Sequence, residues 1–322
     1  MGAALRLLHG STAQPEVQGS ADLTPAGLAV LVGCATTMTR WLLTIVVLTF
    51  ACHCAPIAPR VTPSFPARSV YVRDGAALVA SSTARAALIE RLARRQLRGI
   101  TPYQLSPLLV DVAGRRRLAA WIDEVHRAGG EVIVPVAGLD RVTALRQVIA
   151  ENPTTWLDGA VTEFEYWNRP DREVARAEFR TLLEAIAAAG PALAPGRALR
   201  VGAYLGYPTA DEAAELAPYL DFVHLDYSVA SPRDAWAHVH AKGGALRDRF
   251  AWFAEAGVEV WPIFYAVGEV DMAPALTELG LAGVEARFQN DLGADPDYHQ
   301  LAVTGFAYFT LEALPDAAWP LR

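Results

Sequence analysis

Glu163 and Glu165, two residues apart, end a short segment that has the composition of a buried β-strand. The segment spans residues 158–166 and reads DGAVTEFEY, in which a turn-prone Asp-Gly pair is followed by β-branched and aromatic residues. Because the side chains of a strand alternate between its two faces, both carboxyl groups are expected to point the same way. Burying two acids on one face of a strand costs free energy unless they have hydrogen-bond or charge partners. A protein keeps such a pair mainly where it has a function, so this pair is the leading candidate for a functional site. An exposed edge strand with solvated glutamates is the alternative.

Short segments of strand character alternate with helical stretches from residue 69 onward. The expected strands are Ser69–Arg73, Gly99–Leu105, Glu131–Val136, Leu157–Glu165, Arg200–Leu205, Phe222–Tyr227, Val258–Tyr265 and Gly305–Leu311. Between them apolar residues recur at helical spacing, as in the series Leu118, Trp121, Ile122 and Val125. Eight such alternations in about 250 residues predict an α/β protein with a (β/α)8 TIM barrel. No Gly-x-Gly-x-x-Gly follows the first strand, which argues against a doubly wound open sheet.

In such barrels the chemistry lies at the C-terminal ends of the strands. The residues expected there are Tyr103, Gly138, Glu163, Glu165, Trp167, Tyr204, Tyr207, Asp226, Tyr227, Trp261, Tyr265, Phe309 and Glu312. Many of them are aromatic, and aromatic faces suit the apolar faces of sugar rings, although they also fill ordinary barrel cores. A carbohydrate site and plain packing both stay open at this point.

Residues 158–165 resemble the signature Asp-Gly-x-Asp-x-Asp-x-Glu of glycoside hydrolase family 18, the chitinase-like barrels. Weaker similarities follow in chain order. Residues 224–227 resemble the family's Met-x-Tyr-Asp with Tyr and Asp exchanged, and residues 261–265 resemble its Pro-x-Tyr region. Residues 305–309 are similar to the last-strand Gly-x-Met-x-Trp, with Phe in place of Trp. The resemblance covers residues 69–315, and only its fourth-strand motif is specific.

The resemblance implies hydrolysis of glycans that contain β-linked N-acetylglucosamine, assisted by the substrate's own acetamido group. It implies that Glu165 is the general acid and that Glu163 holds the acetamido N–H and offsets positive charge on the intermediate. Asp226 or Tyr227 is expected to orient the acetamido group. The other residues expected to bind the sugar are Tyr204, Trp167, Tyr265 and Phe309. The implied partner is an oligo- or polysaccharide, and no cofactor is implied.

The chain departs from the family pattern at two positions of the fourth strand. Val161 stands where the family has its first aspartate, and Glu163 replaces the second aspartate with a side chain about 1.5 Å longer. Two alternatives therefore stay open. One is a non-catalytic glycan-binding barrel, which is expected if aromatics such as Trp167 and Tyr207 cover the glutamates. The other is an unrelated barrel hydrolase that pairs Glu165 with Glu269 or Glu312.

Composition narrows the classes of protein further. The chain is 52% hydrophobic and 20% charged, which is typical of a globular protein with a sizeable core. Its net charge is −7, and no basic run is interleaved with aromatics, so a nucleic-acid partner is not expected. Lys242 is the only lysine. The three cysteines, Cys34, Cys52 and Cys54, precede the barrel, so no thiolate site is expected within it.

The histidines give no firm metal or catalytic pattern. His238 and His240 are two apart on an expected helix, do not share a face and are expected to be solvated. His224 is expected beside Asp226 in the barrel, as a polar pair, a weak metal site or a hydrogen-bonded structural residue. His-Glu-x-x-His, Gly-x-Ser-x-Gly and Walker-type sequences are all missing. No metal site is predicted.

An apolar segment near the N-terminus has the properties of an export signal. Residues 41–51 form an uncharged run of eleven residues, too short for a bilayer span of about 20 residues but suited to a signal-peptide core. Met38 and Arg40 precede this run. The pattern predicts a signal peptide or lipoprotein-like segment over residues 38–54, with residues 1–37 as an extension of the gene model or a disordered region.

Residues 49–52, Thr-Phe-Ala-Cys, resemble the lipobox that precedes a lipidated cysteine, which makes Cys52 a candidate for lipidation. Cleavage after Ala51, or retention as an anchor, is the alternative. Residues 55–68 are expected to form a Pro-rich linker and residues 69–322 the barrel domain. The barrel is expected to be secreted, periplasmic or anchored to a bacterial cell envelope, with membrane contact only through the N-terminal segment or its lipid.

Overall fold

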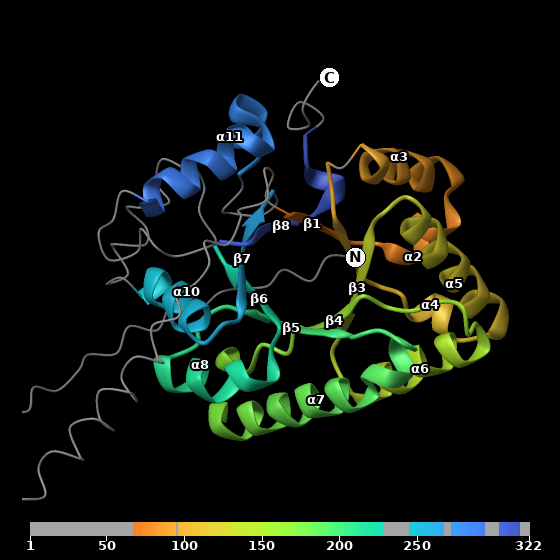
Figure 1. Cartoon of the computed structure of the whole chain (residues 1–322), viewed down its shortest axis with the longest axis horizontal. Helices are drawn as coiled ribbons and strands as arrows, with labels where there is room; N and C mark the ends of the chain where they lie inside the picture. Colours follow the sequence, from red (N-terminus) through yellow and green to blue (C-terminus); the bar gives the residue numbers. More distant parts are fainter. Residues whose placement is uncertain (1–66, 95, 228–244, 267–271, 294–302, 316–322) are drawn as a thin grey trace, which may run out of the picture. The chain divides into compact units, whose positions relative to one another are not determined.

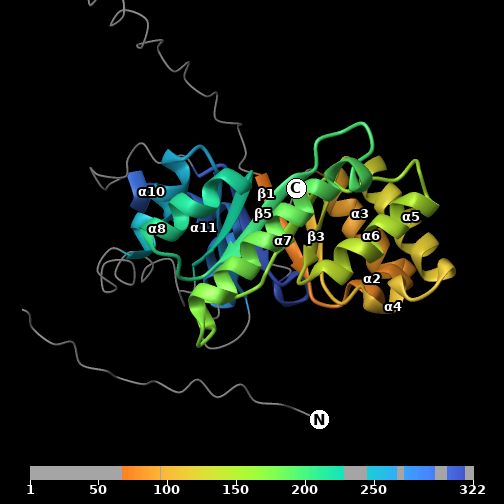
Figure 2. The ribbon, with the colours of Figure 1, turned by 90° about the horizontal axis from the view of Figure 1, so that it is seen from below.

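The computed structural model describes residues 67–94, 96–227, 245–266, 272–293 and 303–315. Eight parallel strands in this part of the chain form a closed barrel, with helices around its outside (Figure 1; Figure 2). The strands are β1 (Ala67–Val72), β2 (Gly99–Pro102), β3 (Glu131–Val136), β4 (Gly159–Thr162), β5 (Arg200–Leu205), β6 (Phe222–Asp226), β7 (Glu259–Tyr265) and β8 (Gly305–Phe309). Each strand pairs with the next, and β8 pairs with β1. The predicted (β/α)8 barrel is confirmed.

Helices connect successive strands, and their apolar faces lie against the barrel. The α-helices are α2 (Gly75–Ala80), α3 (Ser82–Ala93), α4 (Ser106–Leu109), α5 (Val112–Arg127), α6 (Leu139–Glu151), α7 (Arg172–Leu193), α8 (Ala210–Leu216), α10 (Ala245–Glu255) and α11 (Ala273–Gly293). Short 3-10 turns are η1 (Tyr166–Asn168), η2 (Ala217–Tyr219) and η3 (Leu311–Ala313). Gly280, with φ 67°, interrupts α11. Among the described residues no helix has the length and apolar character that a membrane crossing requires. The predicted export segment, including Cys52, lies outside the described residues.

Two strands end three residues earlier than the sequence predicts. β2 ends at Pro102 and β4 ends at Thr162, whereas strands were expected to continue to residues 105 and 165. After β4 the chain turns at once, with the Tyr166 N–H donating to the Phe164 carbonyl at 2.8 Å, and enters η1. Glu163 and Glu165 therefore lie in the connection that follows the strand.

Aromatic side chains fill the interior of the barrel, and glycines on the neighbouring strands make room for them. A Cβ atom on Gly202 would lie 2.1 Å from the Phe222 ring, and one on Gly305 would lie 2.7 Å from Trp261. Trp261 is 1% exposed. Its predicted place at the rim is wrong, because it lies in the interior of β7, four positions before the strand ends at Tyr265.

A buried ion pair lies over the seam between β1 and β8. The Arg68 Nε and Nη2 atoms donate to the two carboxylate oxygens of Glu285 on α11, at 2.6 Å each. The Tyr308 hydroxyl of β8 donates to the same carboxylate at 2.7 Å. All three side chains are buried, so neither charge is solvated and each depends on the other for its stabilisation.

We expect Glu285→Gln to lower the free energy of unfolding by roughly 3–5 kcal/mol, because it removes the counter-charge of a buried guanidinium. Urea denaturation of the full-length protein, followed by tryptophan fluorescence, measures the loss. The matched control is Glu90→Gln, which removes an exposed ion pair with Arg94 at the C-terminal end of α3 and should cost about 1 kcal/mol or less. Equal losses in the two variants would show that the seam does not depend on this pair.

Candidate functional site

Aromatic side chains surround the C-terminal mouth of the barrel. We call Tyr71, Tyr103, Tyr204, Tyr265 and Phe309 the aromatic ring; all of them pack together from five different strand ends. Tyr71 stacks on Tyr103 with centroids 5.5 Å apart, and Phe309 lies 5.7 Å from Tyr71 and 5.3 Å from Tyr265. The Tyr265 hydroxyl donates to the Tyr204 hydroxyl at 2.9 Å. The mouth thus presents both aromatic faces and phenol groups.

Glu163 lies against this aromatic ring. Burial raises the pKa of the Glu163 carboxyl to about 7, although the phenols of Tyr103 and Tyr71, as hydrogen-bond donors, act to lower it. The charge of Glu165 raises it again by a smaller amount. The Oε1 atom of Glu163 is buried and has no hydrogen-bond partner in the part of the chain that the structure describes. Near neutral pH this carboxyl group can both take up and release a proton.

Glu165 has a different environment. Its side chain is exposed, and its carboxylate accepts a hydrogen bond from Asn168 Nδ2 at 2.8 Å. Burial acts instead on the carboxyl group of Glu163. The reason is that β4 ends at Thr162, so the chain turns before the alternation of strand side chains reaches Glu165.

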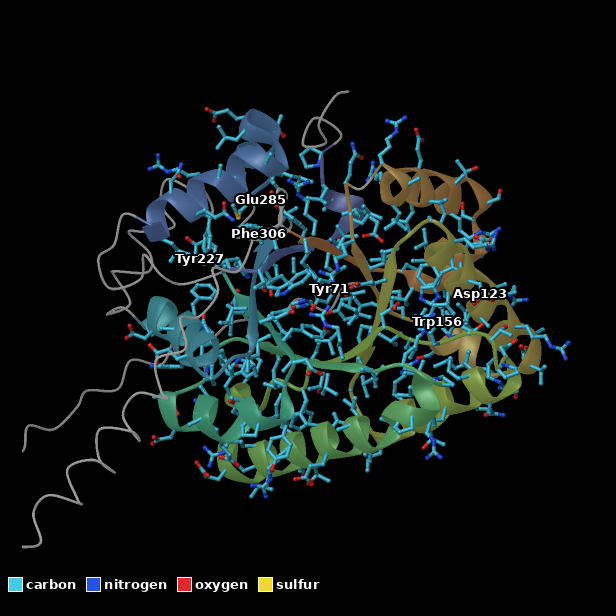
Figure 3. All side chains as sticks on the ribbon, viewed as in Figure 1. Tyr71, Asp123, Trp156, Tyr227, Glu285 and Phe306 are labelled. Carbon is cyan, nitrogen blue, oxygen red and sulfur yellow. The ribbon has the colours of Figure 1, made fainter. Side chains whose placement is uncertain are left out.

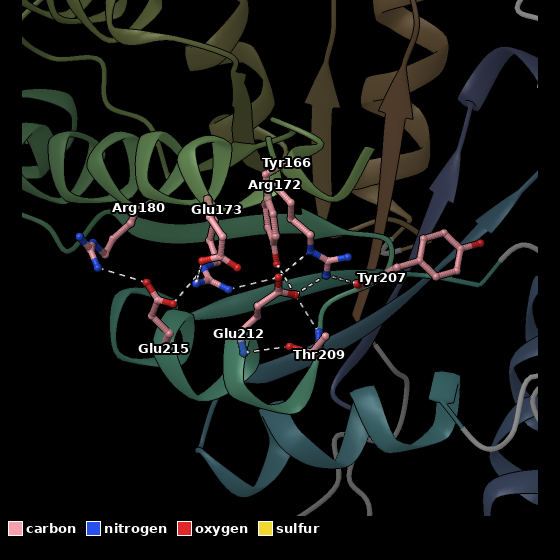
Figure 4. A network of polar contacts seen from close by, with 9 residues as sticks. Tyr166, Arg172, Glu173, Arg180, Tyr207, Thr209, Glu212 and Glu215 are labelled. Atoms are coloured by element: carbon pink, nitrogen blue, oxygen red, sulfur yellow. Dashed lines mark hydrogen bonds and ion pairs between the residues drawn. The ribbon is translucent and has the colours of Figure 1, made fainter. Parts of the chain in front are cut away.

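A polar network fixes the connection that carries the two glutamates (Figure 4). Tyr166, which follows Glu165 directly, is fully buried and donates to Glu212 Oε2 at 3.3 Å. Arg172 donates to both oxygens of the Glu212 carboxylate, at 2.7 and 2.5 Å, and to the carbonyl of Tyr207 at 2.8 Å. One guanidinium thus links the segment after β4 to the segment after β5. Burial acts to raise the pKa of Glu212, but its bonds to Arg172 hold it below the usual range, so the network is ionised at neutral pH.

Trp167 and Tyr207 do not enclose Glu163. The Trp167 ring packs edge-on against Tyr204 at 5.6 Å and lies over Gly206, where a Cβ atom would be 2.7 Å from its Nε1. Tyr207 is 45% exposed. Glu163 instead borders a cavity of about 120 Å³, whose walls include Tyr103, Gln104, Leu105, Val136 and Arg141.

Asp226 ends β6 and Tyr227 follows it, with the two side chains on opposite faces. Asp226 faces the mouth, where its charge acts on Tyr204, Tyr265 and the buried Arg249 of α10. Burial lowers the pKa of Arg249, and Asp226 acts to raise it.

Tyr227 lies outside the ring of strands, toward α11, whereas Tyr71 lies within it (Figure 3). It packs edge-on against Phe264 at 5.4 Å and Phe288 at 4.8 Å. The predicted substrate contact of Tyr227 is therefore not supported, because strand alternation turns this ring into the outer core.

His224 is a buried structural partner of the mouth. Its Nδ1 atom lies 2.6 Å from the Tyr71 hydroxyl. Burial, aided by the charge of Arg200, lowers the pKa of His224 to about 3, so the ring is neutral. The described residues contain no group of three or more His, Cys, Asp or Glu side chains that could hold a metal ion. The hydrogen-bonded structural role considered for His224 is the one the geometry supports.

The remaining rim candidates lie elsewhere. Glu312 Oε1 accepts the backbone N–H of Arg73 at 2.9 Å and lines a groove along α2 and α3. Gly138 is the N-cap of α6. Glu269 lies outside the described residues, and so do His238 and His240.

Three residues at the mouth were missing from the predicted set. Tyr71 had a detectable signal, because it lies inside the first predicted strand at an inward-facing position. Arg141 and Arg249 reach the mouth from α6 and α10, and a single arginine in an amphipathic helix gives no such signal.

Comparisons with known proteins give no family. No family model matches the chain, and no curated protein matches it. Similar solved structures include a chitinase-like agglutinin from Robinia pseudoacacia, at 10% identity and TM-score 0.48, over 78% of this chain and 96% of that one. A DHDPS from Cyanidioschyzon merolae with lysine bound is 13% identical, with TM-score 0.42, over 78% and 72% of the two chains. A xylose isomerase domain protein from Planctomyces limnophilus is 12% identical, with TM-score 0.43, over 78% and 92%. At these values none of the likenesses bears on function.

We expect Glu163 to make folding stability depend on pH. Its pKa rises from the ordinary value of 4.5 to about 7 on folding, so the folded state binds the extra proton and stability falls as pH rises between these values. The Glu163→Gln variant should lack this loss and should be more stable than the parent protein at pH 8. Urea denaturation of both proteins at pH 5 and pH 8 measures the effect.

Glu165→Gln is the matched control, because it keeps the buried carboxyl group of Glu163 and should keep the loss of stability between pH 5 and pH 8. A Glu163→Gln variant whose stability changes with pH as that of the parent does would contradict the raised pKa.

Proposed function

We propose that this chain is a glycoside hydrolase of the family 18 kind, acting on glycans with β-linked N-acetylglucosamine at the mouth of the barrel. The observation that carries the proposal is the Glu163 carboxyl group, which titrates near neutrality among the faces and phenols of the aromatic ring. The fourth-strand resemblance supports the same reaction. The apolar segment 41–51 supports export of the enzyme, which N-terminal sequencing of the mature protein would test.

The two glutamates have separate roles in the proposed reaction. Glu165, on the solvent side, donates its proton to the glycosidic oxygen of the leaving sugar. The acetamido oxygen of the other sugar attacks the anomeric carbon, the glycosidic C–O bond breaks, and a cyclic oxazolinium ion forms. Water then adds to the anomeric carbon and returns a proton to Glu165 as the acetamido group re-forms.

Glu163 supports this reaction from deeper in the mouth. As a carboxylate it accepts the acetamido N–H and offsets the positive charge that develops on the ring. Tyr204, Trp167, Tyr265 and Phe309 would hold the apolar faces of the sugars, and Asp226 would accept hydroxyl or amide hydrogens.

A non-catalytic glycan-binding barrel is the second candidate, because one observation favours it. Val161 is fully buried and packs with Ile133, Phe222 and Trp261, so an apolar layer stands where the family has its first aspartate. A valine has no proton to exchange with Glu163, as an aspartate at this position would have, and binding does not need such an exchange.

We expect the full-length protein to hydrolyse fluorogenic N-acetylglucosaminides or chito-oligosaccharides. Glu165→Gln should lower kcat/KM roughly 10²–10⁴-fold, the usual contribution of a general acid. Glu163→Gln should lower it too, because an amide offsets no positive charge. The control is Glu312→Gln, whose side chain binds the backbone of Arg73 away from the mouth and should leave kcat/KM unchanged. Binding of chito-oligosaccharides without turnover in every protein would replace the hydrolase with the binding barrel.

A further inference from the structure

The cavity beside Glu163 has the dimensions of a subsite for one small substituent. It opens between the ends of β2 and β3 and the first turn of α6, and its volume is about 120 Å³. That is the share of roughly four water molecules in the liquid, at ~30 Å³ each, so it has room for a group of a few atoms. Because Glu163 forms part of its wall, a sugar bound at the mouth could extend a substituent into it.

Arg141 gives the cavity its chemical character. It is the one Arg or Lys side chain among the lining residues. Its Nη2 atom donates to Ser106 Oγ at 2.8 Å, whereas Nη1 is buried and has no hydrogen-bond partner among the described residues. A buried donor left unpaired is costly, and a guanidinium suits the two oxygens of a carboxylate. Arg141 therefore brings to the cavity wall a positive charge that a carboxylate of a bound ligand would complement.

The other ionisable groups around the cavity do not cancel this charge in mildly acidic solution. Burial raises the pKa of Glu163 to about 7, so most of it is uncharged at pH 6. Burial also raises the pKa of Tyr103, which leaves that phenol neutral. At pH 6 the wall of the cavity therefore has a net positive charge.

The backbone of one residue in the cavity wall is also unusual. Gln104 has φ 53°, in the left-handed region that residues other than glycine rarely adopt. Such strain is concentrated at ligand-binding sites, where surrounding structure holds it in place. The Gln104 side chain is exposed and forms part of the cavity wall, so its amide is available to a bound group.

We propose that this cavity binds a carboxylate-bearing substituent of the glycan, and that Arg141 is the residue that selects it. The substrate class is then an acidic glycan containing N-acetylglucosamine, in preference to a neutral one such as chitin. The inference rests on the proposed glycan-binding function of the mouth and holds for either a hydrolase or a binding barrel.

Isothermal titration calorimetry at pH 6 tests the proposal, on the full-length protein with Glu165→Gln so that the probes are not consumed. Three tetrasaccharides are compared: neutral chitotetraose, a hyaluronan tetrasaccharide with uronate carboxylates, and alternating N-acetylglucosamine and N-acetylmuramic acid with lactyl carboxylates. We expect at least one acidic probe to bind about tenfold more tightly than chitotetraose. The better acidic probe distinguishes a uronate from a lactyl carboxylate.

Adding Arg141→Gln should remove this preference and leave the affinity for chitotetraose unchanged, whereas Arg141→Lys, which keeps the charge, should retain part of it. Arg146→Gln is the matched control, an exposed arginine of the same helix away from the cavity, and should change nothing. Binding of chitotetraose with no preference for acidic probes, or equal weakening of all probes by Arg141→Gln, overturns the subsite and leaves the proposed function intact. Failure of every probe to bind overturns both.

Discussion

The buried contact of Arg68 with Glu285 and Tyr308 is the interaction on which closure of the barrel depends. It joins the first strand, β1, to the last strand, β8, and to the helix before it, α11. Arg68 and Glu285 are 217 positions apart in the sequence, so the contact links the two ends of the barrel. A buried guanidinium without its carboxylate would be strongly unfavourable, so the seam and α11 stabilise each other. An open sheet of the same strands would leave this charge without a partner.

Closure in turn creates the environment of Glu163. Arg68 and Tyr71 lie three positions apart on β1 and so face opposite sides, as do the neighbours Tyr308 and Phe309 on β8. When the outward residues close the seam, the inward ones complete the aromatic ring, with Tyr71 and Phe309 5.7 Å apart. This ring withdraws Glu163 from solvent, and the loss of hydration raises its pKa. The acid at the mouth is therefore tuned by a contact on the outside of the barrel.

The sequence was sufficient to predict the barrel and part of the mouth, because both follow from the regular alternation of strand-like and helical segments. Eight strand-like segments predicted the fold, and the C-terminal ends of these segments placed Asp226, Tyr204, Tyr265 and Phe309 at the mouth. The end of β4 could not be predicted, because residues 163–165 have strand-like types and the turn is held by Tyr166 on Glu212, a contact across 46 positions. Tyr227 could have been assigned correctly, since alternation from Asp226 turns it outward.

The two departures from the family motif are physically linked. Val161 continues the apolar layer formed with Ile133, Phe222 and Trp261, where a carboxylate would be buried without a partner. With valine at position 161, the acid that lies against the aromatic ring is Glu163, in the connection that follows β4. Asp226 on the far side is balanced by the buried Arg249, whose pKa it acts to raise. Burial raises the pKa of Glu163 to about 7, so the charge on this carboxyl group changes near neutral pH. A ligand that extends a carboxylate into the cavity beside Glu163 would meet the guanidinium of Arg141, which is placed to compensate that charge.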